Sequence, residues 1–309
     1  MDKFKQLKSI LGEEVQEHIV LRDYTTMKVG GVADYFYIAK TIEELVQAVL
    51  AAKKLDIPFQ VLGGGSNILV SDFGFGGLII LNRTSNLVVL SDKAQIIVDS
   101  GVSLVRLITE AANRGLSGLE GLYGIPGTIG GAVYGNVGAN GTEIIEFLKS
   151  VTVLSTNGKI LKYPAKWLEA NYRLTRIKKM KKEGKEPAII LSLKFQLAHN
   201  KKEDILRRIS YYKKLKEERQ PYNLPSAGSI FKNPGDGKEK SAGFLLEKIG
   251  AKKIKIGDAE VSKKHANFII NRDQAKAQEI RALIDELREK VREHENINLE
   301  EEIEYVGQW

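Results

Sequence analysis

The residues best suited to chemistry in this sequence form a short loop after an apolar run. Gly63, Gly64 and Gly65 are followed by Ser66 and Asn67. Three glycines let successive backbone N–H groups turn toward one point and form an anion-binding nest, and the two polar side chains add hydrogen-bond donors. The loop predicts a diphosphate site, although a plain turn gives the same pattern. It matches neither G-x-G-x-x-G nor G-x-x-x-x-G-K-[ST], which disfavours a Rossmann unit or a P-loop NTPase.

A second glycine cluster lies further along the chain. Its glycines recur at every third position, as Gly118, Gly121, Gly124, Gly127 and Gly130. Glycine is needed where the backbone takes positive φ or where another group must approach it closely. The run is too short and too interrupted for collagen. Taken alone, it fits tight turns as well as a ligand loop, but two bare-backbone loops in one domain favour a long ligand bound between them.

Three further groups of residues could do chemistry but are ordinary in isolation. Ser229 lies in the Gly- and Pro-rich stretch 226–234 and lacks the G-x-S-x-G context of a hydrolase nucleophile. The pair Tyr172-Arg173 is typical of a protein surface, and the acidic stretch 300–302 is typical of a solvated edge. Each group therefore has a purely structural explanation unless another observation connects it with the glycine loops.

The composition excludes several classes of site. The 309 residues include no cysteine, which excludes disulfides, thiol nucleophiles and cysteine-ligated metals. The four histidines are scattered without ligand spacing, so we expect no metal site. The N-terminus lacks the apolar core of a signal peptide, and no run approaches the roughly 18 apolar residues of a membrane span. We therefore expect a cytoplasmic protein with no membrane partner.

The net charge of +8 is local rather than general. Residues 162–216 contain 17 Lys or Arg and 5 Asp or Glu, so the rest of the chain is slightly acidic. Such a stretch fits either a solvated face or a surface that attracts the phosphates of a nucleotide. It lacks the interleaved aromatic residues and glycines of an RNA-binding surface. We expect no nucleic-acid partner and a monomeric chain.

Periodicity and capping residues predict the elements that position these loops. Thr41 with Glu44 forms a capping box, Ser103 caps another helix, and Asn157-Gly158 is a strong hairpin signal. The predicted helices cover about 4–11, 41–55, 103–115, 202–218 and 242–249, with a long C-terminal helix capped by Asp273. The predicted strands cover 35–38, 59–62, 78–81, 95–98, 151–155, 159–162, 188–196, 266–271 and 302–306. Apolar residues resume at 68–70 after the first glycine loop. The stretch 219–237 is predicted to be a loop.

The complete set of motifs resembles one family, the UDP-N-acetylenolpyruvoylglucosamine reductases of bacterial cell-wall synthesis. The resemblance covers nearly the whole chain, and its blocks occur in order at compatible spacings. These blocks are 24–31, 62–70, 124–132, 136–139, 172–173, 225–234, 261–268 and 299–307. The resemblance connects the otherwise ordinary serine, arginine and glutamates with the glycine loops.

This resemblance implies an α+β fold with a two-part FAD-binding domain of the vanillyl-alcohol-oxidase type and a smaller α/β substrate-binding domain. The first would cover residues 1–200, with subdomains of about 1–80 and 81–200, and the second 206–298, while the tail 299–309 returns to the first. The implied reaction uses NADPH to reduce FAD. Hydride then passes to the enolpyruvyl group of UDP-N-acetylglucosamine enolpyruvate, which gives UDP-N-acetylmuramate. The partners implied are thus a nucleotide sugar and NADPH.

The family's motifs also imply which residues bind each ligand. The residues implied to contact FAD are Gly63, Gly64, Gly65, Ser66, Asn67, Gly124, Ile125, Gly127, Thr128, Gly130, Gly131, Ala132, Asn136 and Gly138. The residues implied to bind the nucleotide sugar are Tyr172, Arg219, Lys232 and Asn233, of which Asn233 and Arg219 would hold its diphosphate.

Three residues are implied to carry the chemistry. Arg173 would pair with the substrate carboxylate, toward which charge moves when hydride adds to the adjacent double bond. Glu302 would carry or share a proton in order to stabilise the same group. Ser229 would donate a proton to the carbon left carbanionic, and Lys232 or Arg173 would supply the positive field that a weakly acidic hydroxyl needs.

The chain departs from the family pattern at two places. The family usually has proline where this chain has Glu301, so the identification of Glu302 depends on counting from Leu299 and Gly307. No counterpart of the tyrosine-bearing loop of one branch is present, so the chain resembles the branch that lacks it, and the basic stretch would replace some of its charge. A flavin oxidase or dehydrogenase for another sugar or alcohol is the competing interpretation, and the Ser229 segment argues against it.

Overall fold

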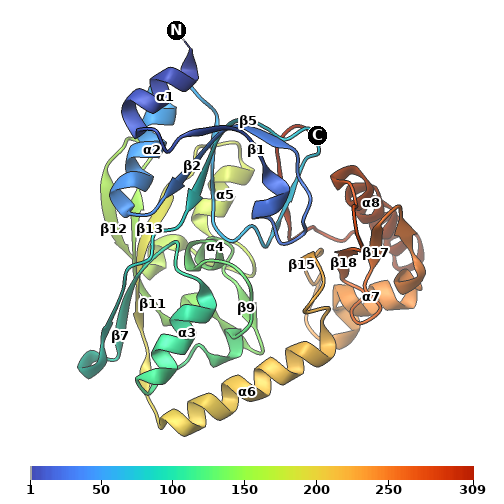
Figure 1. Ribbon diagram of the computed structural model, residues 1–309. Helices are drawn as coiled ribbons and strands as arrows, with labels where there is room; N and C mark the ends of the chain where they lie inside the picture. Colours follow the sequence, from blue (N-terminus) through green and yellow to red (C-terminus); the bar gives the residue numbers. More distant parts are fainter. Residues whose placement is uncertain (1) are drawn as a thin grey trace. The chain divides into compact units, whose positions relative to one another are not determined.

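Figure 1 shows the computed structural model of the chain, which describes residues 2–309. Helices and strands are mixed along the chain, as the predicted α+β class requires. The chain divides into two compact units. Unit 1 contains the residues up to Gln16, Tyr35–Gly64 and Leu78–Lys214, and unit 2 contains Glu17–Asp34, Gly65–Gly77 and Leu215–Trp309. The domain boundaries expected from the sequence stay a prediction. They are defined by ligand binding, and the boundaries of ligand-binding domains need not coincide with those of compact packing units.

The larger part of unit 1 is built on a five-stranded antiparallel sheet. Its strand order is β12-β11-β13-β7-β6. The bounds are β6 Leu87–Leu90, β7 Gln95–Asp99, β11 Leu148–Leu154, β12 Ile160–Pro164 and β13 Ile189–Gln196. Buried side chains of β7, β11 and β13 form one core with α3 (Leu104–Asn113) and α4 (Ile129–Tyr134). The predicted hairpin and the predicted strand 188–196 are confirmed.

A second core of unit 1 lies around the two N-terminal helices, α1 (Lys3–Leu11) and α2 (Ile42–Lys54). The predicted N-cap of α2 is confirmed, because the Thr41 hydroxyl accepts the Glu44 N–H. The second half of the predicted capping box differs, because the Glu44 carboxylate accepts the N–H of Lys40 and not that of Thr41. The adjoining sheet has the order β1-β2-β5-β3. Its strands are β1 Gln16–Val20, β2 Val32–Ala39, β3 Phe59–Leu62 and β5 Phe75–Asn82, and β1, β2 and β5 pass from one unit into the other.

Short elements complete unit 1. They are α5 (Arg176–Lys182), β8 (Leu116–Ser117), β9 (Gly138–Ala139), β10 (Thr142–Glu143) and β14 (Ala198–His199), with short 3-10 turns between them. The long helix α6 (Lys202–Arg219) begins in unit 1 and ends in unit 2.

Unit 2 has its own core. A four-stranded sheet of order β15-β18-β17-β16 packs with α7 (Ala242–Lys248) and α8 (Ala277–Glu295). Its strands are β15 Ser226–Ser229, β16 Lys255–Ile256, β17 Ala259–Val261 and β18 Phe268–Asn271. The C-terminal strand β19 (Glu304–Val306) pairs in parallel with β4 (Ile68–Val70), the strand that follows the first glycine loop. The tail therefore returns to that loop.

Two predictions about unit 2 are wrong in detail. The stretch 219–237 contains the short strand β15, which sequence periodicity cannot reveal in four small and polar residues. Asp273 does not cap the long helix, which begins at Ala277. Instead both carboxylate oxygens of Asp72 accept the N–H groups of Ala277 and Gln278, at 2.9 and 3.0 Å.

The cap supplied by Asp72 gives a direct test of this arrangement. A carboxylate that accepts the first N–H groups of a helix satisfies orphan donors and complements the helix dipole. We expect Asp72→Ala to lower the free energy of unfolding by about 1–2 kcal/mol, measured by urea denaturation. The matched control is Asp273→Ala, because Asp273 is an exposed residue just before the same helix. Equal losses in the two variants would contradict the role of Asp72.

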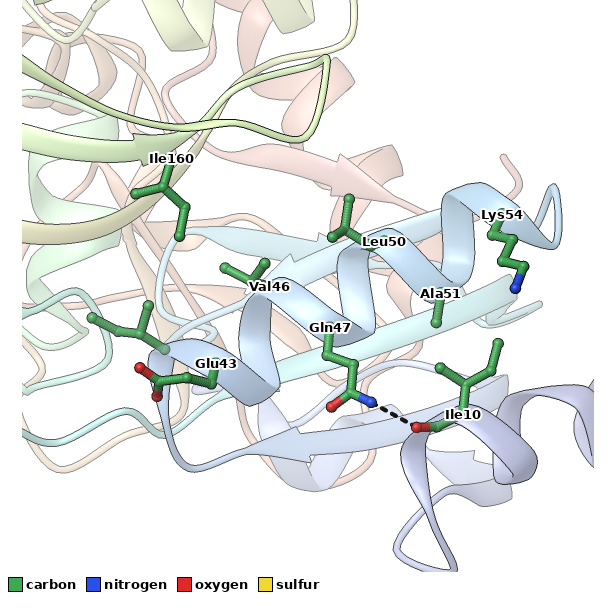
Figure 2. A pocket seen from close by; sticks show the side chains of 9 residues that line it. Ile10, Glu43, Val46, Gln47, Leu50, Ala51, Lys54 and Ile160 are labelled. Carbon is green, nitrogen blue, oxygen red and sulfur yellow. Dashed lines mark hydrogen bonds between the residues drawn. The ribbon is translucent and has the colours of Figure 1, made fainter.

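An apolar pocket of about 410 Å³ opens beside α1 and α2 in unit 1. Figure 2 shows that Ile10 of α1, Val46 and Leu50 of α2, and Ile160 of β12 line it, and that the Gln47 side chain donates to the Ile10 carbonyl at 2.7 Å. None of the residues singled out in the sequence for ligand binding lines this pocket.

Candidate active site

Unit 1 brings parts of the two glycine loops into direct contact. Gly63 and Gly64 follow β3, and Gly127 and Thr128 precede α4. A Cβ atom on Gly64 would lie 2.6 Å from the Gly127 Cα, and one on Gly63 would collide with the Thr128 hydroxyl. The bare backbone at these positions is therefore required for one loop to pack on the other. Their expected contact with a ligand stays a prediction.

The second loop is also fixed to the turn between β7 and α3. Leu104 donates its N–H to the Gly127 carbonyl at 3.1 Å, and Gly130 donates to the Ser100 carbonyl at 2.8 Å. A Cβ on Gly130 would lie 2.8 Å from the Ser100 Cβ. The loop is thus held on both flanks, so its backbone presents a rigid surface.

The earlier glycines of the period-three run serve packing and turns. Gly118 has φ +140°, and a Cβ there would strike the ring of Phe147. The Gly118 N–H donates to the buried carboxylate of Glu120, which also accepts from Arg208 at 2.8 Å. Burial raises the pKa of Glu120, but the hydrogen bonds from Arg208 and the backbone outweigh burial and hold that pKa below its usual value. The expected structural role of Gly118 is consistent with these contacts.

Asn136 lies fully buried just after α4 and has a left-handed backbone, with φ +45°. Its side-chain amide donates to the Glu143 carboxylate at 2.8 Å and to the Asn171 carbonyl at 3.0 Å. Within residues 2–309 its Oδ1 atom is buried and accepts no hydrogen bond. A buried acceptor without a donor is costly, and such groups gather at functional sites.

Arg173 lies at the tip of a tight turn next to this asparagine. Asn171 and Leu174 exchange backbone hydrogen bonds of 2.8 and 3.1 Å, which places Tyr172 and Arg173 at the two turn positions. Arg173 has φ +54°, a strained conformation for a residue other than glycine. Its guanidinium donates to the Gly138 carbonyl at 2.7 Å and to the carbonyl of Asn136 at 3.3 Å. These bonds fix the orientation of the cation.

Two residues that follow Arg173 were missed in the sequence. Thr175 is buried, caps α5 and donates its hydroxyl to the Tyr134 carbonyl at 2.7 Å, so it ties the start of α5 to the end of α4. Lys178 is only 2 % exposed, and its ammonium lies 5.8 Å from the centre of the Tyr134 ring. The basic stretch is therefore not solvated throughout. A threonine two residues after an arginine carries no signal in a single sequence.

Unit 2 holds the Ser229 segment in an unusual strand. Ser226 pairs with Ile270 and Ser229 pairs with Phe268, so β15 contains a bulge between its two pairs. Gly228 has φ +78° in this bulge, and a Cβ there would meet nothing within 4 Å. Glycine is therefore needed for the backbone conformation rather than for space. The bulge sets the direction in which Ser229 leaves the strand.

The acidic tail runs beside the residues that follow Ser229. Glu302 donates its N–H to the Ile230 carbonyl at 2.8 Å, and Lys232 donates its N–H to the Glu300 carbonyl at 2.8 Å. The Lys232 ammonium also pairs with the Glu300 carboxylate at 2.7 Å, and Glu301 pairs with Arg288. Glu300 and Glu301 thus each have a defined cationic partner. Because Glu300 offsets the charge of Lys232, this lysine supplies a weaker positive field than the sequence suggested.

The rest of the first glycine loop joins the same group in unit 2. The Asn67 side chain donates to the Glu302 carbonyl at 3.1 Å, and the Asn67 carbonyl accepts the Glu304 N–H at 3.0 Å. Thr26, to which sequence reasoning assigns no separate role, joins the loop to the serine strand. Its N–H donates to the Gly65 carbonyl, and its hydroxyl donates to the Ser226 carbonyl at 2.7 Å. The second part of the loop, from Gly65 on, therefore lies in the same unit as the serine strand and the tail.

The expected diphosphate ligands are less closely grouped. The Asn233 Oδ1 atom accepts the Ala242 N–H at 3.1 Å at the start of α7, so this side chain has a structural role. Arg219 is exposed at the end of α6, and Tyr172 is 46 % exposed. The remaining second-loop residues expected at FAD are Gly124, Ile125, Gly131 and Ala132, which flank or form the first turn of α4. The binding roles of all these residues stay predictions.

The contact between the loops predicts a specific loss of cofactor. We expect the added methyl group of Gly64→Ala to push the two loops apart, because overpacking of this kind costs about 1–3 kcal/mol. The affinity for FAD should then fall at least ~10-fold. The control is Gly76→Ala, at an exposed position of β5 where a Cβ would make ordinary 3.8 Å contacts with the side chains of Asp34 and Gln308. Titration of the apoprotein with FAD, followed by flavin fluorescence, measures both. Unchanged affinity in Gly64→Ala would show that this contact does not shape the cofactor site.

Comparisons with known proteins agree over the whole chain. A family model described as an FAD binding domain matches residues 33–163, and one described as the C-terminal domain of UDP-N-acetylenolpyruvoylglucosamine reductase matches residues 220–306. The reductase of that name from Carboxydothermus hydrogenoformans is 37% identical over 311 residues, covering 100% of both chains. That from Bacillus subtilis is 37% identical over 93% of this chain and 92% of its own. The crystal structure of the Thermus caldophilus enzyme matches with a TM-score of 0.79 at 36% identity, covering 94% of this chain and 98% of its own.

Proposed function

Because this chain belongs to the UDP-N-acetylenolpyruvoylglucosamine reductase family and is an FAD-containing oxidoreductase, we propose that NADPH is its reductant and that Ser229 supplies the proton. The product is UDP-N-acetylmuramate, a peptidoglycan precursor. NADPH and nucleotide sugars are cytoplasmic metabolites, so the proposal places the enzyme in the cytoplasm. Of the residues 2–309, none belongs to a helix long and apolar enough to cross a bilayer.

The residues of unit 1 fit an FAD site. The two touching glycine loops offer backbone without side chains, and the buried Oδ1 atom of Asn136 is an acceptor with no donor in the described chain. Backbone N–H groups and bare backbone of this kind suit a diphosphate and the edge of a flavin ring. FAD, when bound, supplies the hydride transfer, which no protein side chain can perform. The protein must therefore bind FAD, orient the substrate and supply the proton.

The first task of the side chains is to stabilise charge on the substrate carboxylate. Hydride addition to the methylene carbon of the enol-ether double bond leaves negative charge on the neighbouring carbon, which bears the carboxylate. A fixed cation beside that carboxylate therefore interacts more strongly with the transition state than with the ground state. Arg173 is suited to this role because the carbonyls of Asn136 and Gly138 already fix its guanidinium. Glu302 is proposed to share a proton with the same carboxylate.

The second task is to deliver a proton to the neighbouring carbon. Ser229 is the proposed donor, since the bulge at Gly228 fixes the backbone that presents its hydroxyl. A serine hydroxyl is a weak acid, so it must act where charge already favours proton release. Lys232, although paired with Glu300, is the cation close to Ser229 along the chain. Asn233, Arg219 and Tyr172 are proposed to bind the nucleotide-sugar portion.

The contact of the Ser229 segment with the glutamate tail carries this proposal, because it joins two motifs that are far apart in sequence. The test is anaerobic. Purified yellow enzyme is bleached with one equivalent of NADPH and then mixed with UDP-N-acetylglucosamine enolpyruvate. We expect rapid return of the oxidised flavin absorbance. Absence of reoxidation, with reoxidation by another sugar or alcohol-derived acceptor, would favour the competing flavin dehydrogenase.

A further inference from the structure

The two residues that follow Ser229 are held by one buried residue, Asn267. Asn267 is 3 % exposed and lies in the turn before β18. Its Oδ1 atom accepts the Phe231 N–H at 2.9 Å, and its side-chain amide donates to the Phe231 carbonyl at 2.8 Å. Its own carbonyl accepts the Ile230 N–H at 2.9 Å. Three hydrogen bonds thus fix the backbone at the point where it leaves the strand.

This contact continues the sheet where the strand ladder stops. The last pair of β15 and β18 is Ser229 with Phe268. Beyond it the Asn267 amide presents one donor and one acceptor to Phe231, as a neighbouring strand would. On the other edge, the tail completes the pairing through the Ile230 carbonyl and through the bridge between Phe231 and Glu301. The segment after Ser229 is therefore held on both sides.

Asparagine is the residue type that this geometry requires. Aspartate has the same shape but only acceptor oxygens when ionised, so one of them would face the Phe231 carbonyl without a donor. A leucine would leave the Phe231 N–H and carbonyl both buried and unsatisfied, because Phe231 is 1 % exposed. Both changes disturb the backbone two residues beyond the candidate proton donor.

The backbone of Asn267 is itself fixed by His265. Its N–H donates to Nδ1 of His265 at 3.2 Å, and the His265 ring packs edge-on against Phe268. Burial lowers the pKa of His265, while Glu247 opposes and Lys252 adds to this shift. The neutral ring keeps an acceptor nitrogen for this bond. A Cβ on Gly243 of α7 would lie 3.0 Å from the ring, which shows how tightly α7 packs on it.

We propose that Asn267 is a positioning residue that sets the direction of the Ser229 hydroxyl for proton transfer, an inference that rests on the proposed function. Its side chain bonds the backbone of Phe231, so Asn267 would act through that backbone rather than on the reacting groups. Misplacement of a reacting group by about 1 Å can cost on the order of 10²-fold in rate. The effect should therefore fall on the protonation step and not on flavin reduction.

The test compares Asn267→Asp with a matched variant, Asn271→Asp. Asn271 is an equally buried amide in β18, and its side chain donates to the Met27 carbonyl at 3.1 Å and accepts the Ala275 N–H at 3.0 Å. Stopped-flow absorbance measures the NADPH and substrate half-reactions separately, in H₂O and D₂O. We expect Asn267→Asp to slow flavin reoxidation by roughly 10-fold to 10²-fold with a larger solvent isotope effect. Asn271→Asp should lose thermal stability and keep its reoxidation rate.

A double variant distinguishes this proposal from its premise. If Asn267 acts through Ser229, Ser229→Ala combined with Asn267→Asp should be no slower than Ser229→Ala alone. Additive losses, or equal slowing of both half-reactions in Asn267→Asp, would overturn the positioning role. If the wild-type enzyme is not reoxidised by the substrate, the proposed function fails instead. Hydrogen exchange in the peptide covering 226–233 then still decides the inference, because Asn267→Asp must increase exchange there and Asn271→Asp must not.

Discussion

Ser229→Ala should leave the reduction of FAD by NADPH within about twofold of the wild-type rate and slow reoxidation by the enolpyruvyl substrate at least ~10²-fold, the range for loss of a general acid. The alanine removes only the hydroxyl, and the bulge at Gly228 and the bonds at Ile230 and Phe231 remain. Rapid-mixing absorbance measurements on each half-reaction check this. The solvent isotope effect on reoxidation should change in the same variant, because another proton source must then act.

The matched control for this prediction is Ser226→Ala. Ser226 occupies the first position of the same strand, and its contacts with Thr26 involve only its backbone. The Ser226→Ala variant should therefore retain the wild-type rates of both half-reactions. If Ser229→Ala slowed FAD reduction and reoxidation equally, the serine would support the fold of the segment rather than donate a proton.

The parts of the fold that sequence predicts well are those with local causes. Thr41 caps the start of α2, because its hydrogen bond with the Glu44 N–H joins neighbouring residues. The Asn157-Gly158 turn fixes the hairpin of β11 and β12 for the same reason. The family resemblance then supplied the order of motifs, and unit 2 does bring the Ser229 strand beside the tail.

The parts that could not be predicted depend on partners far away in the chain. Asp72 caps a helix 205 residues later, and no periodicity connects the two segments. Asn267 contacts Phe231 through two side-chain bonds across 36 residues. Gly64 and Gly127 were both expected at a ligand, and the close approach of the Gly127 Cα explains why position 64 lacks a side chain. Single sequences reveal the residue types of such contacts but not their pairing.

The orientation of Arg173 makes it the second residue whose change should have a large effect. Arg173→Lys keeps the charge, but an ammonium cannot bond the Asn136 and Gly138 carbonyls and still present a planar donor pair to a carboxylate. We expect reoxidation by the substrate to slow on the order of 10²-fold to 10³-fold, as when one oxyanion donor is removed. Flavin reduction by NADPH should change little, and the KM for the substrate should rise.

The matched control is Arg207→Lys, since the Arg207 side chain is 78% exposed on α6 and forms an ion pair with Asp204. A second variant, Arg173→Gly, tests the backbone, because glycine adopts φ +54° without the strain that arginine bears there. It should fold and bind FAD, and added guanidinium should restore part of its reoxidation rate. Loss of FAD from both Arg173 variants, with normal reoxidation in the fraction that keeps it, would assign this arginine to the cofactor loop and not to the substrate carboxylate.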